Sequence, residues 1–366
     1  LKTERRRSGV LEIGDMLEER YRILSELGRG EMGIVYRALD PALDRRVAIK
    51  LVAPTHASTR SIRDRFMTEA RAMARVSHPN VVAIHALGEH HGTPYFVMEL
   101  VEGSDLETWL HEQDRLPLSI PQAVSILSEI GAGVEAIHEA GATHGDLKPS
   151  NVLVDPKGRM VVTDLGLARL LDSEVRKTLE LAGTPAYMAP EILAMEKVPP
   201  KLAKRVDVYS LGVIAFELLT GRPPFDADGL VQLLNMHATM PPTPPSSLRP
   251  EIGPIGDEVL IGALAKDPRL RTGSAKELVE GLERMADAAA EGLAQLHVAI
   301  VDDDPDFVTF ARLALEGAFP SAKIDVYPCG EAAIAGVTAS PPAVALVDLQ
   351  LPDVNGLEVA ATLRAE

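Results

Sequence analysis

Short runs of alternating or continuous apolar residues occupy much of the early chain, and longer runs with helical spacing follow them. The short runs predict strands, which we place at residues 21–24, 47–49, 81–87, 95–99, 152–154 and 160–163. The longer runs predict helices, which we place at residues 62–76, 123–138, 211–219 and 273–295. The chain up to about residue 285 is therefore predicted to be rich in strands first and in helices afterwards.

A different pattern begins near residue 296. Two continuous apolar runs, Leu296–Val301 and Ala343–Val347, predict buried parallel strands, and a third strand is predicted at 323–327. Helix-like runs at 307–315 and from Glu331 separate them. Strands that alternate with helices are typical of a doubly wound α/β domain, in which residues at the carboxyl ends of the strands share one crevice.

Composition and charge disfavour several classes of function. The chain has 366 residues, of which 46% are hydrophobic and 25% charged, as in soluble globular proteins. A net charge of −16 argues against nucleic-acid binding through a basic surface. No apolar run approaches the roughly 18–20 residues that span a bilayer, and a single cysteine, Cys329, fits a reducing compartment. We therefore expect a cytoplasmic fragment with no nucleic-acid partner and no membrane segment.

Residues suited to phosphoryl transfer gather in a short polar segment, His144–Asn151, between a helix-like and a strand-like run. Asp146 can accept a proton from a hydroxyl group, Lys148 can neutralise phosphate charge, and Asn151 can hold a magnesium ion. A second carboxylate, Asp164, follows the next predicted strand and is placed to bind metal as well. Taken alone, the segment also fits small-molecule phosphotransferases, such as aminoglycoside and choline kinases, which use a His-Gly-Asp loop ending in Asn.

A glycine-rich segment, with Gly28, Gly30 and Gly33, lies near the start of the ordered pattern. Glycines let a hairpin approach phosphates closely, with its amide groups facing the anionic oxygens. The same spacing occurs in dinucleotide-binding sites and in plain turns, but a dinucleotide site needs a helix at these glycines. Strand-like runs follow here, which favours a hairpin over nucleotide phosphates and makes Lys50, at the end of a predicted strand, a candidate phosphate ligand.

Three further segments resemble protein kinases. Gly183–Glu191 (Gly-Thr-Pro-Ala-Tyr-Met-Ala-Pro-Glu) is similar to the substrate-docking loop of Ser/Thr protein kinases, which the small-molecule phosphotransferases lack. Asp207–Val213 resembles the helix whose aspartate supports the catalytic loop, and Lys266–Arg271 resembles the segment whose arginine pairs with Glu191. Residues 21 to about 285 therefore resemble bacterial, eukaryotic-like (Hanks-type) Ser/Thr protein kinases.

This resemblance implies a two-lobed α+β kinase fold, with a small β-rich N-lobe and a larger helical C-lobe. We expect a flexible tail over residues 1–20, an N-lobe over 21–101, a C-lobe over 102–285 and a helical linker over 286–295. The implied activity is transfer of the γ-phosphoryl group of ATP to Ser or Thr hydroxyl groups of proteins.

The resemblance also implies roles for individual residues. Asp146 would orient the substrate hydroxyl, Lys148 would stabilise the transferred phosphoryl group, and Lys50, paired with Glu69, would bind the α and β phosphates. The implied ATP contacts are Gly28, Gly30, Gly33, Val35, Ala48, Lys50, Met98, Glu99, Val101, Asn151, Leu153 and Asp164. Of these, Asn151 and Asp164 would hold Mg²⁺ or Mn²⁺.

Gly145 replaces the arginine that this family usually carries between the His and Asp of the catalytic loop. That arginine normally grips a phosphate on the activation segment. We therefore predict a kinase that does not need this phosphate and keeps its activity in a Thr178→Ala variant, although Thr178 and Ser173 are candidate autophosphorylation sites. Two alternatives stay open, namely a non-catalytic kinase-like scaffold and a small-molecule phosphotransferase.

Residues 296–366 resemble the first part of a response-regulator receiver domain, which would be incomplete at its C-terminus. The resemblance implies that Asp348 accepts a phosphoryl group from a histidine kinase or phosphotransfer protein, whereas Asp304 fits a helix N-cap. The implied magnesium site comprises Asp302, Asp303, Asp348 and the carbonyl group of Gln350. The kinase partners would be proteins with Ser or Thr acceptors, and homodimer formation stays open.

Overall fold

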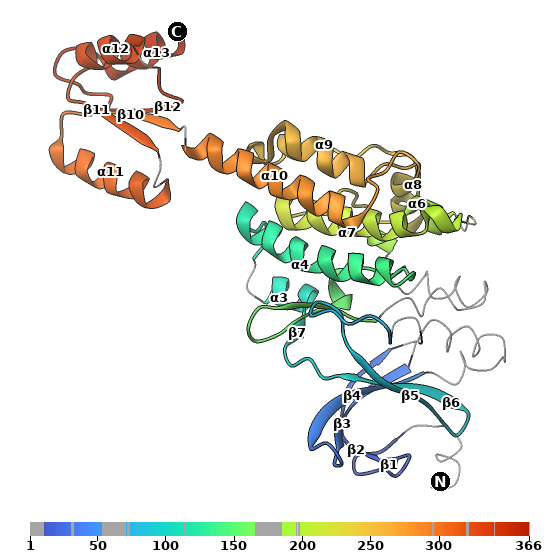
Figure 1. Cartoon of the computed structure of the whole chain (residues 1–366). Coiled ribbons are helices and arrows are strands. Elements are labelled where there is room, and N and C mark those ends of the chain that lie inside the picture. Colours follow the sequence, from blue (N-terminus) through green and yellow to red (C-terminus); the bar gives the residue numbers. More distant parts are fainter. Residues whose placement is uncertain are drawn as a thin grey trace. The chain divides into compact units, whose positions relative to one another are not determined.

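The structure is a computed structural model, and it describes residues 11–30, 33–52, 71, 74–112, 115–164, 185–194, 196, 198–294, 296–319, 322–339 and 341–365. The chain divides into two compact units, Leu1–Glu283 and Arg284–Glu366 (Figure 1). Among the described residues, no helix combines the length and the apolarity that crossing a bilayer would require.

The first unit begins with an antiparallel sheet in the order β1-β2-β3-β4-β6-β5. Its strands are β1 (Met16–Leu17), β2 (Tyr21–Gly30), β3 (Gly33–Asp40), β4 (Arg45–Val52), β5 (Ile84–His90) and β6 (Thr93–Glu99). Side chains alternate between the two faces of a strand, so Val47 and Ile49 of β4 point into the core of this lobe, where both are fully buried. Ala48 and Lys50 lie on the opposite face.

The segment expected to be a flexible tail differs from that expectation over residues 11–20. Strand β1 pairs with β2, and Leu11 and Leu17 are buried in the same core as Ile49. The backbone N–H of Leu11 also donates to the hydroxyl oxygen of Tyr36 at 3.2 Å. The sequence of this piece shows no regular apolar pattern, because only two of its residues are buried and polar residues lie between them. Residues 1–10 lie outside the described part of the chain.

The rest of the first unit is mainly helical, as predicted. Its helices are α3 (Leu106–His111), α4 (Ile120–Glu139), α6 (Pro190–Leu193), α7 (Lys204–Thr220), α8 (Leu230–Thr239), α9 (Gly253–Ala263) and α10 (Ala275–Ala294), which crosses into the second unit. Short 3₁₀ helices are η1 (Pro149–Asn151), η3 (Pro185–Tyr187), η4 (Pro200–Leu202), η5 (Pro245–Ser247) and η6 (Pro250–Ile252). Helix α7 is buried almost all round, and α4 and α9 pack against it.

A small sheet, β7 (Ser104–Asp105), β8 (Val152–Val154) and β9 (Met160–Val162), lies beside α3 and α4. The predicted strands at 152–154 and 160–163 are confirmed by β8 and β9. The predicted strand at 81–87 is confirmed only from Ile84 onward. Residues 79–83 instead approach β9, because Val81 bridges to Val162 in parallel.

The second unit confirms the predicted alternation of strands and helices. Its elements are β10 (His297–Val301), α11 (Pro305–Ala318), β11 (Lys323–Tyr327), α12 (Gly330–Ala339), β12 (Val344–Val347) and α13 (Gly356–Ala365). The three strands form a parallel sheet in the order β11-β10-β12, with α11 on one face and α12 and α13 on the other (Figure 1). The central strand β10 is almost fully buried, which explains its continuous apolar run.

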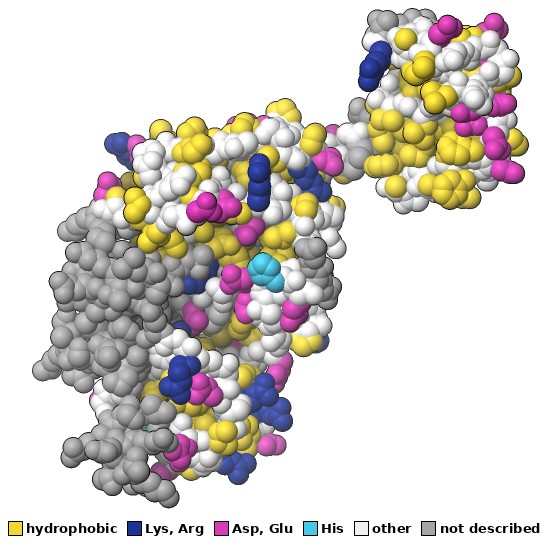
Figure 2. All heavy atoms as spheres, turned by 180° about the vertical axis from the view of Figure 1, so that it is seen from behind, with side chains coloured by type: hydrophobic (Ala, Val, Ile, Leu, Met, Phe, Trp, Pro, Cys, Tyr) yellow, Lys and Arg dark blue, Asp and Glu magenta, His cyan; other side chains and the backbone are white. Residues whose placement is uncertain are grey.

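Apolar side chains also remain on the surface of this unit (Figure 2). Exposed large apolar residues on α11 and β12 are Phe307, Phe310, Leu313, Val344 and Leu346. Strand β12 is an edge strand of the described sheet. Among the described helices, α11 alone covers the face opposite to α12 and α13.

Candidate active site

The polar segment singled out in the sequence forms a loop between α4 and β8. Within it, the side-chain amide of Asn151 donates to the Asp146 carboxylate at 3.0 Å and to the Asp146 backbone carbonyl at 2.7 Å. The ammonium group of Lys148 lies 3.3 Å from the same carboxylate. The three residues therefore form one polar cluster, in which the Asp146 side chain keeps 16% of its surface exposed.

Asp207, at the start of α7, fixes the backbone of this loop. Its buried carboxylate accepts hydrogen bonds from the N–H groups of His144 at 2.7 Å and Gly145 at 2.6 Å, and lies 2.8 Å from Nε2 of His138. Burial alone would raise the pKa of Asp207, but the hydrogen bond with His138, the charges of His138 and His144 and the Gly145 amide outweigh it and lower that pKa. The predicted support of the catalytic loop by this aspartate is confirmed.

Asp164 connects the catalytic loop with the N-lobe sheet. It directly follows Thr163, whose N–H donates to the Asn151 carbonyl at 2.9 Å and whose carbonyl meets Nε2 of His144 at 3.0 Å. Its φ of +57° is unusual for a residue with a side chain and is typical of backbone held in shape for function. The Asp164 carboxylate pairs with the ammonium group of Lys50 at 2.5 Å, so the N-lobe sheet and the catalytic loop meet here.

The register of the N-lobe sheet gathers several of the predicted ATP contacts on one face. Val35 lies opposite Lys50, and Ala48 lies opposite Met98. Directly opposed residues, and residues two apart on one strand, point to the same face. Val35, Ala48, Lys50 and Met98 therefore share the face from which Lys50 reaches Asp164. Glu99 ends β6, Val101 follows it, and Leu153 lies on β8.

The glycines of the β2–β3 hairpin are not explained by packing. Gly28 pairs with Val35, and Gly30 pairs with Gly33, at the end of the two strands. Among the residues that the structure describes, none would come within 4 Å of a β-carbon on Gly28 or Gly30. Room above a hairpin, rather than contact with a neighbour, is what a phosphate-binding loop requires.

Some predicted site residues lie outside the described part of the chain. They are Glu69, Ser173 and Thr178. The pairing of Lys50 with Glu69 and the two autophosphorylation sites therefore stay predictions.

A small pocket lies beside Asp146, between the catalytic loop and the segment that resembles a substrate-docking loop. Gly145, Asp146, Leu147, Tyr187, Met188 and Ala189 are among its lining residues. The Tyr187 hydroxyl donates to the Glu217 carboxylate at 2.6 Å. Burial and the adjacent Glu217 raise the pKa of Tyr187, so the hydroxyl keeps its proton and remains the donor. Glu217 sits in an apolar stretch of α7, and nothing local in the sequence marks its partner.

The segment that carries Tyr187 is anchored by a buried ion pair. The guanidinium group of Arg271 binds both oxygens of Glu191, at 2.8 and 2.9 Å, and both side chains are almost fully buried. The predicted pairing of Glu191 with an arginine of the 266–271 segment is confirmed, and Arg271 is that arginine.

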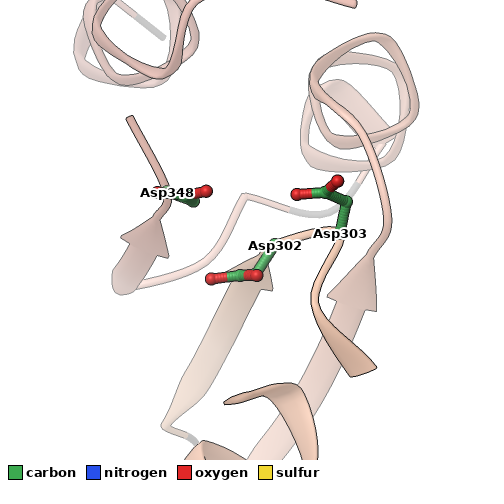
Figure 3. Close-up of side chains that lie close together, drawn as sticks. All are labelled: Asp302, Asp303 and Asp348. Carbon is green, nitrogen blue, oxygen red and sulfur yellow. The ribbon is translucent and has the colours of Figure 1, made fainter. Parts of the chain in front are cut away.

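The second unit holds a separate acidic cluster. Asp302 follows β10, and Asp348 follows β12, so both lie at the carboxyl ends of neighbouring parallel strands. Oxygen atoms of Asp302, Asp303 and Asp348 lie within 4.8 Å of one another and face a common space (Figure 3). Three carboxylates so close repel one another unless a cation joins them, and an all-oxygen donor set suits Mg²⁺.

The loops around this cluster are fixed by capping bonds. The Asp304 carboxylate accepts from the N–H groups of Asp306 and Phe307, which confirms its prediction as the N-cap of α11. The Asp353 carboxylate accepts from the N–H groups of Glu331, Gly330 and Val354, and these bonds lower the pKa of Asp353 to about 2. The loop after Asp348 is thereby tied to the first turn of α12.

Comparisons with known proteins agree with these two units. A family model described as the protein kinase domain matches residues 21–281, and one described as the response regulator receiver domain matches residues 298–366. The chain is 34% identical over 310 residues to a probable serine/threonine-protein kinase of Corynebacterium efficiens, covering 82% of this chain and 46% of that relative. It is 36% identical over 265 residues to the serine/threonine-protein kinase PknA of Mycobacterium tuberculosis, covering 71% of this chain and 59% of PknA.

Solved structures are similar as well. The crystal structure of the Mycobacterium tuberculosis PknI kinase domain matches 75% of this chain and 99% of that domain, with a TM-score of 0.60 and 27% identity. This chain spans about half the length of the curated relatives it matches. It belongs to the protein kinase family, with a receiver domain following the kinase domain.

Proposed function

We propose that the kinase domain transfers the γ-phosphoryl group of ATP to serine or threonine hydroxyl groups of proteins. The observation that carries this proposal is the meeting of Lys50 with Asp164, next to the linked pair Asp146 and Asn151. The reaction needs a cation for phosphate, oxygen ligands for metal and a carboxylate for the hydroxyl proton. These side chains supply all three, and the names of the relatives support Ser and Thr as acceptors.

In this mechanism, Lys50 binds the α and β phosphates from the N-lobe face that also carries Val35, Ala48 and Met98. Asp146 orients the substrate hydroxyl and takes its proton as the oxygen bonds to the γ-phosphorus and the bond to the β-phosphate oxygen breaks, releasing ADP. Lys148 neutralises charge on the transferred group. A magnesium ion held by Asn151 and Asp164 would neutralise the phosphates.

The resemblance of residues 183–191 to a substrate-docking loop supports a protein rather than a small molecule as acceptor. Its Tyr187–Ala189 part lies next to Asp146, where the Tyr187–Glu217 hydrogen bond and the Glu191–Arg271 ion pair hold it in place. A polypeptide lying along this segment would bring a hydroxyl to Asp146.

The direct test is incubation with γ-labelled ATP, Mg²⁺ and casein as a general acceptor, followed by phosphoamino-acid analysis. We expect label on Ser and Thr, and a loss of about 100-fold or more in Asp146→Asn. Asp267→Asn, which breaks an exposed ion pair with Arg269, should behave as the wild type. Label on a small hydroxylated compound but never on protein would favour a small-molecule phosphotransferase, and no transfer at all would favour a scaffold.

For the receiver domain we propose magnesium-dependent phosphorylation of Asp348 by a histidine kinase or phosphotransfer protein. The acidic cluster of Asp302, Asp303 and Asp348 supports this proposal. Acetyl phosphate can serve as a small phosphodonor in the test, and label should appear only with Mg²⁺ and vanish in Asp348→Asn. Label that persists in that variant would contradict the assignment. We place both reactions in the cytoplasm, where ATP is available.

A further inference from the structure

One arginine of the C-lobe reaches across to the end of the N-lobe sheet. Arg159 directly precedes β9, and its Nη2 donates to the carboxylate of Glu99, the last residue of β6, at 2.9 Å. Its Nη1 donates to the Pro79 carbonyl at 2.9 Å, and its Nε to the Asp155 carboxylate at 3.0 Å. All three nitrogens of the guanidinium group are thus engaged, by acceptors from three separate segments.

The same place carries a seam of backbone hydrogen bonds between the lobes. The N–H of Val82 donates to the Val162 carbonyl, and the N–H of Val162 donates to the Asn80 carbonyl, both at 2.9 Å. The Asn80 side chain donates to Glu129 of α4 and to the Met160 carbonyl, both at 2.8 Å. Hydrogen bonds therefore join residues 79–82 to the C-lobe.

The seam continues into residues 99–101, the hinge between the lobes, where the resemblance to protein kinases implies that backbone groups bind the adenine edge of ATP. The N–H of Glu99 donates to the Ala83 carbonyl at 2.9 Å, so the end of β6 rests on the segment that β9 holds. Arg159 adds the side-chain bond to Glu99 on top of this backbone contact. The hinge at residues 99–101 is thereby fixed from the C-lobe side.

We infer that Arg159 is a positioning residue for nucleotide binding, which holds the hinge backbone in the conformation that receives the adenine edge. This inference rests on the proposed function. An ordinary surface ion pair contributes little, but a planar guanidinium group that binds three acceptors fixes their relative positions. Without Arg159, ATP binding would carry the additional cost of ordering the hinge.

Loss of Arg159 should weaken ATP binding and leave the rate of the chemical step nearly unchanged. Arg159 makes no hydrogen bond or ion pair with Lys50, Asp146 or Asp164 among the contacts of the described residues. A residue that only positions the hinge changes KM for ATP and leaves kcat nearly constant, because the transition-state contacts are kept.

The test compares Arg159→Gln with Arg269→Gln in the whole chain. Arg269 also forms an ion pair, with Asp267, but lies exposed in a loop of the C-lobe. We expect Arg159→Gln to raise KM for ATP and the Kd for ADP with Mg²⁺, measured by calorimetry, about three- to tenfold, with kcat within about twofold. Arg269→Gln should change neither quantity.

A double-mutant cycle with Glu99→Ala isolates the contact. The double variant should be no weaker in ADP binding than the worse single variant, because both remove the same interaction. The inference would be overturned if the two substitutions weakened ADP binding additively. An unchanged KM in Arg159→Gln, or a lower kcat at constant KM, would overturn it as well. If Arg159→Gln does not fold, Arg159→Lys decides by the same split between KM and kcat, because an ammonium group keeps the charge but lacks the planar fork that binds Glu99, Pro79 and Asp155. A wild-type chain that neither binds ADP nor transfers phosphate would instead refute the proposed function.

Discussion

At the scale of single residues, Asp207 shows how one buried charge can shape a reactive loop. It has no exposure to solvent, and its acceptors are taken by two backbone N–H groups of the catalytic loop and by His138. Because the folded protein lowers the pKa of Asp207 below its ordinary 3.8, the ionised form is the one that stabilises the fold. Its stabilisation is fully present above about pH 4 and is lost as the pH falls through the folded-state pKa.

An Asp207→Asn variant should therefore lose stability at neutral pH and lose less of it on acidification. We expect about 3–5 kcal/mol at pH 7, because partners of a buried charge are left without it, and about a 100-fold lower kcat from the displaced loop. Urea unfolding between pH 7 and pH 3 measures both parts of the stability claim. If the free energy of unfolding falls as steeply on acidification in the variant as in the wild type, a group other than Asp207 limits the stability at acid pH.

Residue-level chemistry could be predicted where the residues that act are close in sequence, as in His144–Asn151. It could not be predicted where the partner is distant. Arg159 follows Asp155, Pro and Lys157 in a charged turn that looks like a solvated surface, yet it binds Glu99, which lies 60 positions away. In the sequence, Gly145 shows only that the family's usual arginine is missing. Its φ of +76° shows that the loop backbone there lies in the left-handed region that glycine adopts at no steric cost.

At the scale of elements, periodicity predicted which segments are strands but not what they pair with. The predicted strand at 81–87 begins with residues that do form inter-strand bonds, but Val81 and Val82 pair with β9 of the C-lobe, and only from Ala83 onward does the chain bond to β6 of the N-lobe sheet. The approach is made possible by Gly133 in α4. A β-carbon on Gly133 would lie 2.5 Å from the Asn80 carbonyl oxygen, which is a backbone atom and cannot move away by a side-chain rotation.

A Gly133→Ala variant should therefore be destabilised by about 1–3 kcal/mol, since the seam between the lobes must shift to admit a methyl group. Gly292→Ala in α10 is the matched control, because no atom of the described part of the chain would lie within 4 Å of its β-carbon. Alanine is the better helix former, so this control should be neutral or slightly stabilising. Equal unfolding midpoints for Gly133→Ala and the wild type would mean that the seam is not tightly packed.

At the scale of the whole molecule, the change in hydrophobic pattern near residue 296 predicted a second unit, and a compact unit begins at Arg284. The order β11-β10-β12 also places Asp302 and Asp348 on adjacent strand ends, which the spacing of the acids alone could not prove. A long helix, α10, crosses the boundary, so helical periodicity gave no sign of where one unit ends.

The acidic cluster predicts a response of the second unit to magnesium. Hydrogen exchange should slow around residues 302–304 and 348–350 when millimolar Mg²⁺ is added, because a cation relieves the repulsion among the carboxylates. Asp303→Asn should remove most of this response, and Asp306→Asn, at the first turn of α11 and outside the cluster, should keep it. A full response in Asp303→Asn would rule out the cluster as the metal site.

The proposed kinase activity requires that Lys50, Asp146, Asn151 and Asp164 act as one phosphoryl-transfer site. The most direct measurement compares MgATP binding and phosphoryl transfer to protein in Asp146→Asn and Asp164→Asn. We predict that Asp146→Asn binds MgATP about as well as the wild type but transfers phosphate about 100-fold more slowly or worse, whereas Asp164→Asn loses both metal-dependent binding and transfer. Transfer at the wild-type rate in Asp146→Asn would contradict the central claim.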